Sequence, residues 1–494
     1  MGVAVINKSD KRKLRVVLVQ PFGFETKNVL PLALAYLKAN LDSAICEVTI
    51  IDCALRGIKA ESREFRELLK ASDADVVAVS SWSPMILEAL GVLRVSKEVN
   101  PATITVIGGN HASTYYGEVM KSPEVDYLFR GEAEVIFCDF IRQIRDDELR
   151  PDTLDGLVYR DTSGALVTSS NMPWIDDLDS VAVPDYRAID LTGYIEKGYR
   201  YSTLSKLNAP LWLTRGCPYR CQFCAAPQLN GKKIRTHSID YVMKMMTDLY
   251  DMGVRHFNII DDNFTFHARY AKDICKAIIN ANFYGITMAT PNGIRLQKGD
   301  PELWQLMYQA GWRRVVIAPE SGSSHILDLM QKDLDLAIVP GVVKDMQQAG
   351  LIVFSFFLIG YPGERPEDLM LTRKLILDVG FDFFTFHLFQ PLPGTPAFDK
   401  MVASGDIPAN FLPGDTLSSD SLVFSKELDG FNVRRFLAVT YVLSWLRHFR
   451  RFLNFIRKVG WRMPLARMLE LVGNKKRGIE LVPETRHLFE APEN

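Results

Sequence analysis

Residues 211–224 read LWLTRGCPYRCQFC, an apolar strand that runs directly into a loop with three cysteines. A glycine and a proline force a tight turn in this loop, so Cys217, Cys221 and Cys224 are expected to converge on one point. Similar strands recur downstream about every 30 to 45 residues, with helical stretches between them. They read FNIIDDNFT, ITMATPNG, RRVVIAPESG, VFSFFLIGYPGE and FDFFTFHLFQPLPG. The repetition predicts a full or partial β/α barrel over residues 205–400, with its chemistry at the strand carboxyl ends.

The sequence before the barrel has its own alternation of strands and helices. Residues 14–150 place β-branched runs such as RVVLVQP, DVVAVSS and TITVIGG between helical stretches. This pattern is typical of a doubly wound, Rossmann-like parallel sheet, which binds ligands outside its strand carboxyl ends. Residues 151–204 are predicted to be a connector with a small hairpin, and residues 401–494 to be helical. The expected fold class is therefore α/β, with a helical C-terminal region.

Composition and charge limit the partners and the location that we expect for this chain. The chain has 494 residues, a formal net charge of −1 and 47% hydrophobic residues. A near-neutral chain has no overall basic field, so nucleic acid is not expected as a partner. The N-terminus lacks the apolar core of a secretory signal, and no run is long and apolar enough to span a membrane. The cytoplasm is the expected location.

The cysteines divide into two groups. Cys46, Cys53, Cys138 and Cys275 lie in apolar or helical surroundings and are expected to be small buried hydrophobes. For the loop cysteines, structural zinc is disfavoured, because it wants four ligands and no second CxxC pair exists. Iron–sulfur clusters normally take four cysteines, so three leave one iron open to a substrate or cofactor.

The loop CPYRCQFC resembles the CxxxCxxC signature of the radical S-adenosylmethionine superfamily. The resemblance implies a [4Fe-4S] cluster on the three cysteines, whose open iron binds S-adenosylmethionine and cleaves it to a 5′-deoxyadenosyl radical. No catalytic base is assigned. The resemblance also implies that residues after each strand bind the cofactor. These residues are Phe223 at the adenine, Asp261, Asp262 and Asn263 at the methionine ammonium, Arg295 at the carboxylate, Glu320 and Ser321 at the ribose, and Gly360 at the cavity floor.

The first domain resembles the cobalamin-binding domain of one branch of this superfamily, which includes class B methyltransferases and tetrapyrrole cyclases. The resemblance implies cobalamin contacts at Pro21, Gly23, Ser80, Ser81, Trp82, Gly108, Gly109, His111, Gly131 and Glu132. Serine hydroxyls offer hydrogen bonds, and paired glycines admit a flat macrocycle.

One departure from cobalamin proteins concerns the lower axial ligand. The D-x-H-x-x-G motif is absent, because His111 is followed by Ala112, Ser113 and Thr114. Many members of the radical branch also lack the motif. Trp82 is expected either to cover the lower cobalt face or to belong to the core. A Rossmann-like scaffold without a cofactor is the alternative for this domain.

The resemblance implies methylation of an unactivated carbon on a small-molecule, lipid-like or tetrapyrrole-like substrate. An electron donor such as flavodoxin or ferredoxin is expected as a partner. The alternatives are cyclisation, rearrangement or oxidation without methyl transfer, a methylthiotransferase with a second cluster on Cys46, Cys53 and Cys138, and a non-catalytic iron–sulfur protein.

Two further predictions concern the C-terminal region and the substrate pocket. The Arg- and aromatic-rich stretch from residue 434 is predicted either to cap the barrel or to contact a membrane surface. Asn292, Phe356, His387 and Gln390 are expected to face the substrate cavity.

Overall fold

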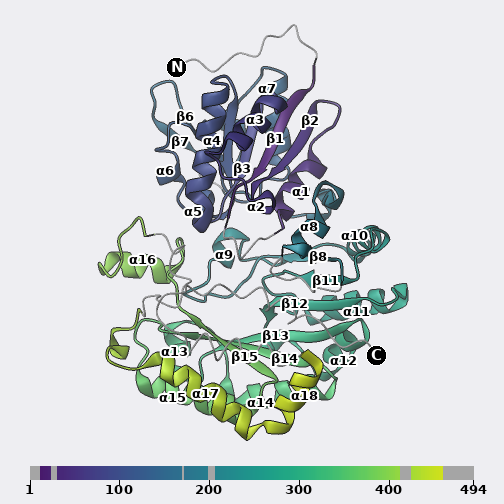
Figure 1. Ribbon diagram of the computed structural model, residues 1–494, viewed down its shortest axis with the longest axis vertical. Coiled ribbons are helices and arrows are strands. Elements are labelled where there is room, and N and C mark those ends of the chain that lie inside the picture. The colour runs from purple at the N-terminus through teal and green to yellow at the C-terminus, as the bar shows by residue number, and fades with distance from the viewer. Residues whose placement is uncertain (1–11, 24–29, 170–171, 198–205, 412–423, 460–494) are drawn as a thin grey trace. The chain divides into compact units, whose positions relative to one another are not determined.

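The computed structural model describes residues 12–23, 30–169, 172–197, 206–411 and 424–459. The chain divides into two compact units, Met1–Tyr199 with Asn410–Gly414, and Arg200–Ala409 with Asp415–Asn494. Each unit is built on a wholly or mainly parallel sheet with helices packed against it (Figure 1). The α/β fold class expected from the sequence is confirmed.

The first unit has a seven-stranded sheet of order β2-β1-β3-β4-β5-β6-β7. Its strands are β1 (Leu14–Gln20), β2 (Cys46–Asp52), β3 (Val76–Ser80), β4 (Ile104–Gly108), β5 (Tyr127–Phe129), β6 (Leu157–Arg160) and β7 (Leu166–Thr168). The first five strands are parallel, and the winding direction changes between β1 and β3. In open parallel sheets, ligands bind outside the strand carboxyl ends at such a switch point.

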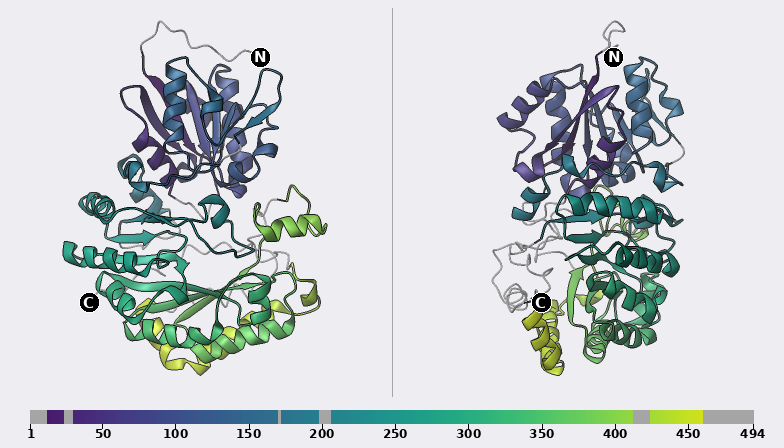
Figure 2. Two further views of the ribbon diagram at one scale, coloured as in Figure 1. Left: turned by 180° about the vertical axis from the view of Figure 1, so that it is seen from behind. Right: turned by 90° about the vertical axis from the view of Figure 1, so that its right-hand side faces the viewer.

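Helices cover both faces of this sheet (Figure 2). They are α1 (Leu32–Asn40), α2 (Cys53–Arg56), α3 (Arg63–Ser72), α4 (Ile86–Val99), α5 (Asn110–Thr114), α6 (Tyr116–Val119) and α7 (Ile136–Arg145). Val16 and Leu18 pack with α1 and α7, whereas Val17 and Val19 pack with α3 and α4. Because successive strand residues point to opposite faces, a sheet covered on both sides requires the continuous apolar runs seen in the sequence.

The segment expected as a connector mostly belongs to the first unit. Its hairpin forms β6 and β7, and β6 pairs antiparallel with β5. Leu157 and Val158 of β6 are buried, so the hairpin covers the edge that the short β5 leaves open. Helix α8 (Leu191–Glu196) also belongs here, because the Tyr194 hydroxyl donates to Asp52 at 2.6 Å.

The second unit has a six-stranded parallel sheet of order β15-β14-β13-β12-β11-β8. Its strands are β8 (Asn208–Leu211), β11 (His256–Ile259), β12 (Thr287–Ile294), β13 (Trp312–Glu320), β14 (Ile352–Ile359) and β15 (Phe383–Leu388). Its helices include α9 (Ala226–Leu229), α10 (Ile239–Asp251), α11 (Ala268–Ala281), α12 (Pro301–Gln309), α13 (Ser324–Leu329), α14 (Val339–Gln348), α15 (Pro366–Val379) and α16 (Pro396–Ala403). This alternation is the partial β/α barrel expected from the repeats.

Two C-terminal helices, α17 (Val433–Arg447) and α18 (Phe449–Val459), straddle strand β15. Tyr441 of α17 stacks on Phe384 at 4.6 Å between ring centroids, and Phe455 of α18 stacks on Phe383 at 5.3 Å. Because adjacent strand residues point to opposite faces, the two helices cover opposite faces of β15. This packing supports the capping interpretation of the stretch, and residues 460–469 of it lie outside the described residues. Over the described part of the chain, no helix has the length and apolar character needed to cross a membrane.

Candidate functional site

The cysteine loop of the second unit is closed at its base and shaped by one glycine. It leaves β9 (Thr214–Arg215) and returns in β10 (Arg235–Thr236), which pair antiparallel. Gly216 has φ +99°, and a Cβ there would lie 2.3 Å from the Lys233 carbonyl oxygen. The Cys217 N–H donates to the Gly231 oxygen at 2.9 Å. Glycine is therefore required for the chain to turn into the first cysteine.

The far side of the loop is held by Gln222, which is buried between two of the three cysteines. Its N–H donates to the Met330 carbonyl at 2.8 Å, and its side-chain oxygen accepts from Lys400 at 2.9 Å. The Cys224 N–H donates to the Cys221 carbonyl at 3.1 Å. These bonds fix the backbone that carries the last two cysteines.

The three thiols are half-buried, free of disulfides and electrostatically coupled. Burial raises the pKa of Cys217 above its usual value and raises the pKa of Cys224 to about 12. Such thiols stay protonated unless a cation stabilises their thiolates, so they suit metal binding rather than nucleophilic catalysis.

The expected convergence of the thiols on one point requires a correction. Within the described residues, no three His, Cys, Asp or Glu side chains lie close enough to hold a single metal ion. In a four-iron cluster each cysteine binds a different iron, so this donor set fits such a cluster better than it fits one zinc ion.

The two aspartates after β11 hold the cysteine loop. Asp261 accepts from the Leu213 N–H and the Thr214 hydroxyl, both at 2.8 Å, and burial raises its pKa to about 7. Asp262 accepts from the Asn230 side chain at 2.8 Å, and burial also raises its pKa. Both carboxylates therefore have partners in the chain, and they position the strand ends around the loop.

The next residue, Asn263, is different. It is 2% exposed, and neither its amide nitrogen nor its oxygen has a hydrogen-bond partner in the structure. A buried amide without partners costs about 1 to 3 kcal/mol, so these atoms suit a polar ligand. Asn263 is the strongest fit among the residues expected to bind S-adenosylmethionine.

Arg295 lies beside the cysteine loop, with a partner that the sequence did not indicate. Its Nη2 lies 3.4 Å from the Cys221 sulfur, and its guanidinium lies 3.4 Å from the centroid of the Tyr219 ring. Its Nη1 donates to the Lys332 and Asp333 carbonyls at 2.7 and 3.1 Å. Arg295 is thus held beside the Cys221 sulfur rather than solvated on the surface.

The end of β13 carries Glu320 in a strained conformation. Its φ of +67° is left-handed, and its carboxylate pairs with Lys332 at 2.7 Å in a largely buried contact. The Lys332 ammonium also lies 5.7 Å from the centroid of the Phe223 ring. Ser321 is buried and shares a hydrogen bond with Thr372 at 3.2 Å, which ties it to α15. Lys332 was missed in the sequence, because it lies in a loop with no motif.

Gly360, at the end of β14, turns with φ +79° and donates its N–H to Glu364 at 2.5 Å. Glu364 is 0% exposed, and its second oxygen has no hydrogen-bond partner in the structure. Burial, together with the Asp368 charge, raises the pKa of Glu364 to about 8. The glycine turn therefore rests on a carboxyl group that stays protonated near neutral pH.

Glu364→Gln is expected to flatten the pH dependence of stability. The folded carboxyl keeps its proton up to about pH 8, whereas the unfolded one loses it near pH 4.5, the ordinary value. The unfolded state thus binds fewer protons between these values, and wild-type stability falls as pH rises, by up to about 1.4 kcal/mol per pH unit. Denaturant unfolding at several pH values measures this, with exposed Glu367→Gln as the control. Identical pH profiles of stability for wild type and Glu364→Gln would contradict a raised pKa at Glu364.

The residues expected to face the substrate cavity come from β12, β14, β15 and the loop just after β15. The Phe356 and His387 rings pack edge to face at 4.9 Å between centroids, and His387 bonds the Thr385 hydroxyl at 3.1 Å. Asn292 is exposed and donates to the Ile260 carbonyl at 2.6 Å. Gln390 is half-buried just after β15. Phe356 and His387 are thus in direct contact.

In the first unit, the carboxyl ends of β3 and β4 meet tightly. The Ser81 N–H donates to the Gly108 carbonyl at 3.0 Å, and the His111 N–H to the Ser81 carbonyl at 3.2 Å. Gly109 has φ +92°, and a Cβ there would lie 2.7 Å from the Ser81 oxygen and 2.8 Å from Ser80 Oγ. Gly109 is therefore required by the neighbouring chain, whereas a Cβ on Gly108 meets nothing closer than 3.7 Å.

His111 is buried at this edge, where its Nδ1 lies 3.0 Å from the Ser83 hydroxyl. Burial lowers the pKa of His111 to about 4, so the imidazole is neutral at physiological pH. Its ring packs against Tyr115 at 5.1 Å between centroids.

The loops after β1 and β3 supply the remaining edge residues. Pro21 is buried, and a Cβ on Gly23 would lie 3.2 Å from the end of the Met85 side chain. Trp82 is 43% exposed and Leu87 is 75% exposed. Trp82 is thus not a core tryptophan, which removes one of its two expected roles.

Gly131 and Glu132 contact the chain that follows the hairpin. A Cβ on Gly131 would lie 2.7 Å from both the Met172 side chain and the Pro173 oxygen. The Glu132 carboxylate accepts from the Ile175 N–H at 2.7 Å. In this structure Gly131 and Glu132 therefore support the fold of the first unit.

The other four cysteines do not form a second cluster site. Cys46 and Cys53 lie at opposite ends of β2, so about 20 Å separates them. Both are buried, as is Cys275, and the half-buried Cys138 donates to the Asn40 carbonyl at 3.1 Å. A methylthiotransferase with a second cluster on Cys46, Cys53 and Cys138 is therefore not supported.

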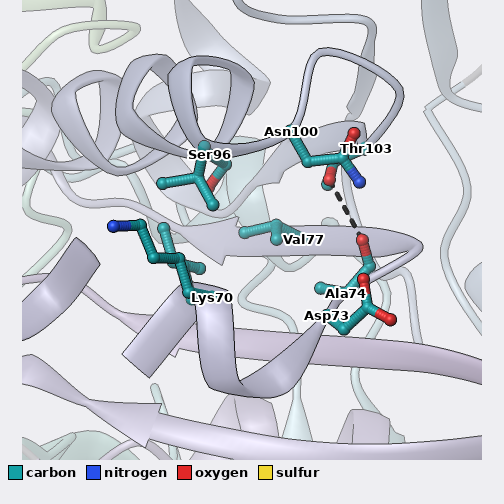
Figure 3. A pocket seen from close by; sticks show the side chains of 9 residues that line it. Lys70, Asp73, Ala74, Val77, Ser96, Asn100 and Thr103 are labelled. Carbon is teal, nitrogen blue, oxygen red and sulfur yellow. Dashed lines mark hydrogen bonds between the residues drawn. The ribbon is translucent and has the colours of Figure 1, made fainter. Parts of the chain in front are cut away.

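A hollow lies in each of the two units. One, of about 590 Å³, borders the outer side of the cysteine loop and is lined by Tyr219, Arg220, Gln297, Asp328 and Asp333 among others. The other, of about 260 Å³, lies at the amino ends of β3 and β4, where Thr103 donates to the Ala74 carbonyl beside Lys70 and Asp73 (Figure 3). The second hollow is at the wrong end of the strands for a ligand of the switch point.

Comparison with known families identifies two domains in the chain. Residues 213–376 match the radical SAM superfamily, and residues 26–141 match the B12 binding domain. The first match contains the cysteine loop and the ends of β11 to β14, and the second contains the carboxyl ends of β2 to β5. The chain therefore carries both of the domains that its sequence was found to resemble.

The chain is also similar to curated proteins and to solved structures. The chain is 26% identical over 453 residues to cytidylyl-2-hydroxyethylphosphonate methyltransferase of Streptomyces wedmorensis, covering 81% of this chain and 84% of the relative. It is 25% identical over 404 residues to anaerobic magnesium-protoporphyrin IX monomethyl ester cyclase of Rubrivivax gelatinosus, covering 78% and 70%. The radical S-adenosylmethionine methyltransferase TsrM of Kitasatospora setae has a similar fold, with a TM-score of 0.67, 18% identity, and 79% and 76% of the two chains covered.

Proposed function

We propose that this chain, a radical SAM protein with a B12 binding domain, methylates a poorly nucleophilic carbon of a small-molecule substrate. The observation that carries the proposal is a three-cysteine loop built for a cluster, in a chain whose other unit is a B12 binding domain. When bound, the cluster supplies an electron that cleaves S-adenosylmethionine, and the corrinoid supplies a carrier for the methyl group.

The second unit's residues are proposed to hold the cluster and S-adenosylmethionine. Cys217, Cys221 and Cys224 ligate three irons, and Asn263 provides a buried donor and acceptor to the cofactor's methionine part. Asp261 and Asp262 keep the loop in place. Phe223 packs at the adenine, and Arg295, Glu320, Ser321 and Gly360 form the remaining walls.

The first unit's residues are proposed to hold cobalamin at the switch point of the sheet. Ser80, Ser81, Gly108 and Gly109 shape the edge, with His111 neutral behind it. Exposed Trp82 offers an apolar surface to the lower face of the macrocycle. Pro21, Gly23, Gly131 and Glu132 set the loops around this edge.

The chain requires an external one-electron donor, which we propose to be a flavodoxin or ferredoxin in the cytoplasm. Free cysteines throughout the chain fit a reducing compartment.

The function is tested by anaerobic incubation with S-adenosylmethionine that carries a deuterated methyl group, with cobalamin, a reductant and a panel of apolar small molecules. The expected result is 5′-deoxyadenosine together with a product that carries the labelled methyl group. Deoxyadenosine formation with a converted but unlabelled product would instead indicate a reaction without methyl transfer, such as the cyclisation that gives the Rubrivivax gelatinosus relative its name. Cys221→Ser protein serves as the inactive control.

A further inference from the structure

Arg295 holds an N–H group against a cluster-ligating sulfur. Its Nη2 lies 3.4 Å from the Cys221 sulfur, within hydrogen-bond range for a sulfur acceptor. A thiolate accepts more strongly than a thiol, because its full charge attracts the guanidinium. The contact therefore strengthens when Cys221 is a metal ligand.

The guanidinium is anchored from its other side by neutral backbone groups. Nη1 donates to the Lys332 and Asp333 carbonyls, and the Gln297 amide donates to the same Asp333 carbonyl at 2.6 Å. None of these partners is a carboxylate, so the positive charge is not neutralised by an ion pair there. The anchoring leaves Nη2 directed at sulfur.

Tyr219 covers the face of the guanidinium. Its ring centroid lies 3.4 Å from the Arg295 carbon, and the residue also lines the hollow beside the loop. The ring therefore covers one side of the guanidinium next to the hollow. A charge shielded from water acts more strongly on its neighbours than an exposed one.

We propose that Arg295 is a positioning residue that raises the reduction potential of the cluster through the Cys221 sulfur. This inference rests on the proposed function, because it requires the cluster. The step it affects is the uptake of one electron from an external one-electron reductant, in which no bond is made or broken. Hydrogen bonds and positive charge at cluster sulfurs favour the reduced form, which carries one more negative charge.

The test measures the cluster itself, without S-adenosylmethionine. Reconstituted wild type and Arg295→Gln are titrated anaerobically with redox mediators, and the reduced cluster is followed by electron paramagnetic resonance. The variant is expected to keep its iron while its equilibrium constant for reduction falls about tenfold, which corresponds to 59 mV for one electron. Arg295→Lys keeps the positive charge but loses the forked guanidinium group. Its equilibrium constant for reduction is expected to lie between those of wild type and Arg295→Gln.

A second pair of variants keeps the inference falsifiable if Arg295→Gln does not assemble a cluster. Tyr219→Leu removes the ring from the guanidinium and is expected to lower the potential, whereas Tyr219→Phe keeps the ring and is the matched control. Unchanged potentials in iron-replete Arg295→Gln and Tyr219→Leu would overturn the inference. A variant that binds S-adenosylmethionine more weakly at an unchanged potential would assign Arg295 to the cofactor carboxylate instead. Wild type that forms no cluster would overturn the proposed function itself.

Discussion

Cys221→Ser is expected to give a folded protein that holds little iron and cleaves S-adenosylmethionine more than about 100-fold more slowly than wild type. Changes around metal ligands already cost about 10- to 100-fold, and this change removes a ligand itself. The fold is expected to survive, because backbone bonds such as Cys217 N–H to Gly231 O shape the loop independently of the thiols. Cys217→Ser and Cys224→Ser are expected to behave in the same way.

Iron and sulfide content per chain, circular dichroism and deoxyadenosine production measure this result. Cys138→Ala is the control, since this cysteine lies on α7 in the other unit and donates only to backbone carbonyls. A Cys221→Ser protein with a full complement of iron and normal turnover would show that the loop is not the cluster site.

Gly109→Ala is expected to abolish cobalamin retention while leaving the cluster in place. The new Cβ would lie 2.7 to 2.8 Å from the backbone of Ser81 and from Ser80 Oγ, in a left-handed conformation. The strain costs about 1 to 3 kcal/mol, and overpacking adds a similar amount. Since the clash is with backbone, the ends of β3 and β4 must separate, which removes the surface proposed to receive the corrinoid.

Gly57→Ala is the matched control for this change. Gly57 has φ +73° in the same unit, but a Cβ there meets nothing within 4 Å. It therefore carries part of the conformational strain, that of a positive φ, without the clash. Corrinoid absorption after desalting, together with iron content, separates the two variants. Equal corrinoid retention in both would refute the placement of cobalamin at this edge.

Much of the architecture follows from local patterns in the sequence. Continuous apolar runs such as RVVLVQ require burial on both faces, and they became central parallel strands. The hairpin at residues 157–168 was predicted as an element, but its attachment to β5 depends on a sheet edge that no local pattern reveals.

For the site, the sequence predicted the residues better than it predicted their partners. Asp261 and Asn263 stand in one short stretch after β11, yet Asp261 has two partners in the chain and Asn263 has none. Which side chain finds a partner is set almost 50 residues earlier, by Leu213 just before β9 and by Thr214 at its start. The Arg295 contact with Cys221 likewise joins residues 74 positions apart. Spacing identifies the ligands of such a site but not the groups that orient them.

The two helices that straddle β15 have a consequence beyond packing. In the described chain β15 pairs only with β14, so no strand pairs with the peptide groups on its outer side, where another polypeptide can add a strand. Helices α17 and α18, set on either face of that strand, crowd the approach to it. Chains that end before residue 433 are thus expected to self-associate through this exposed border, and light scattering of such a truncation would measure the protection that the C-terminal helices provide.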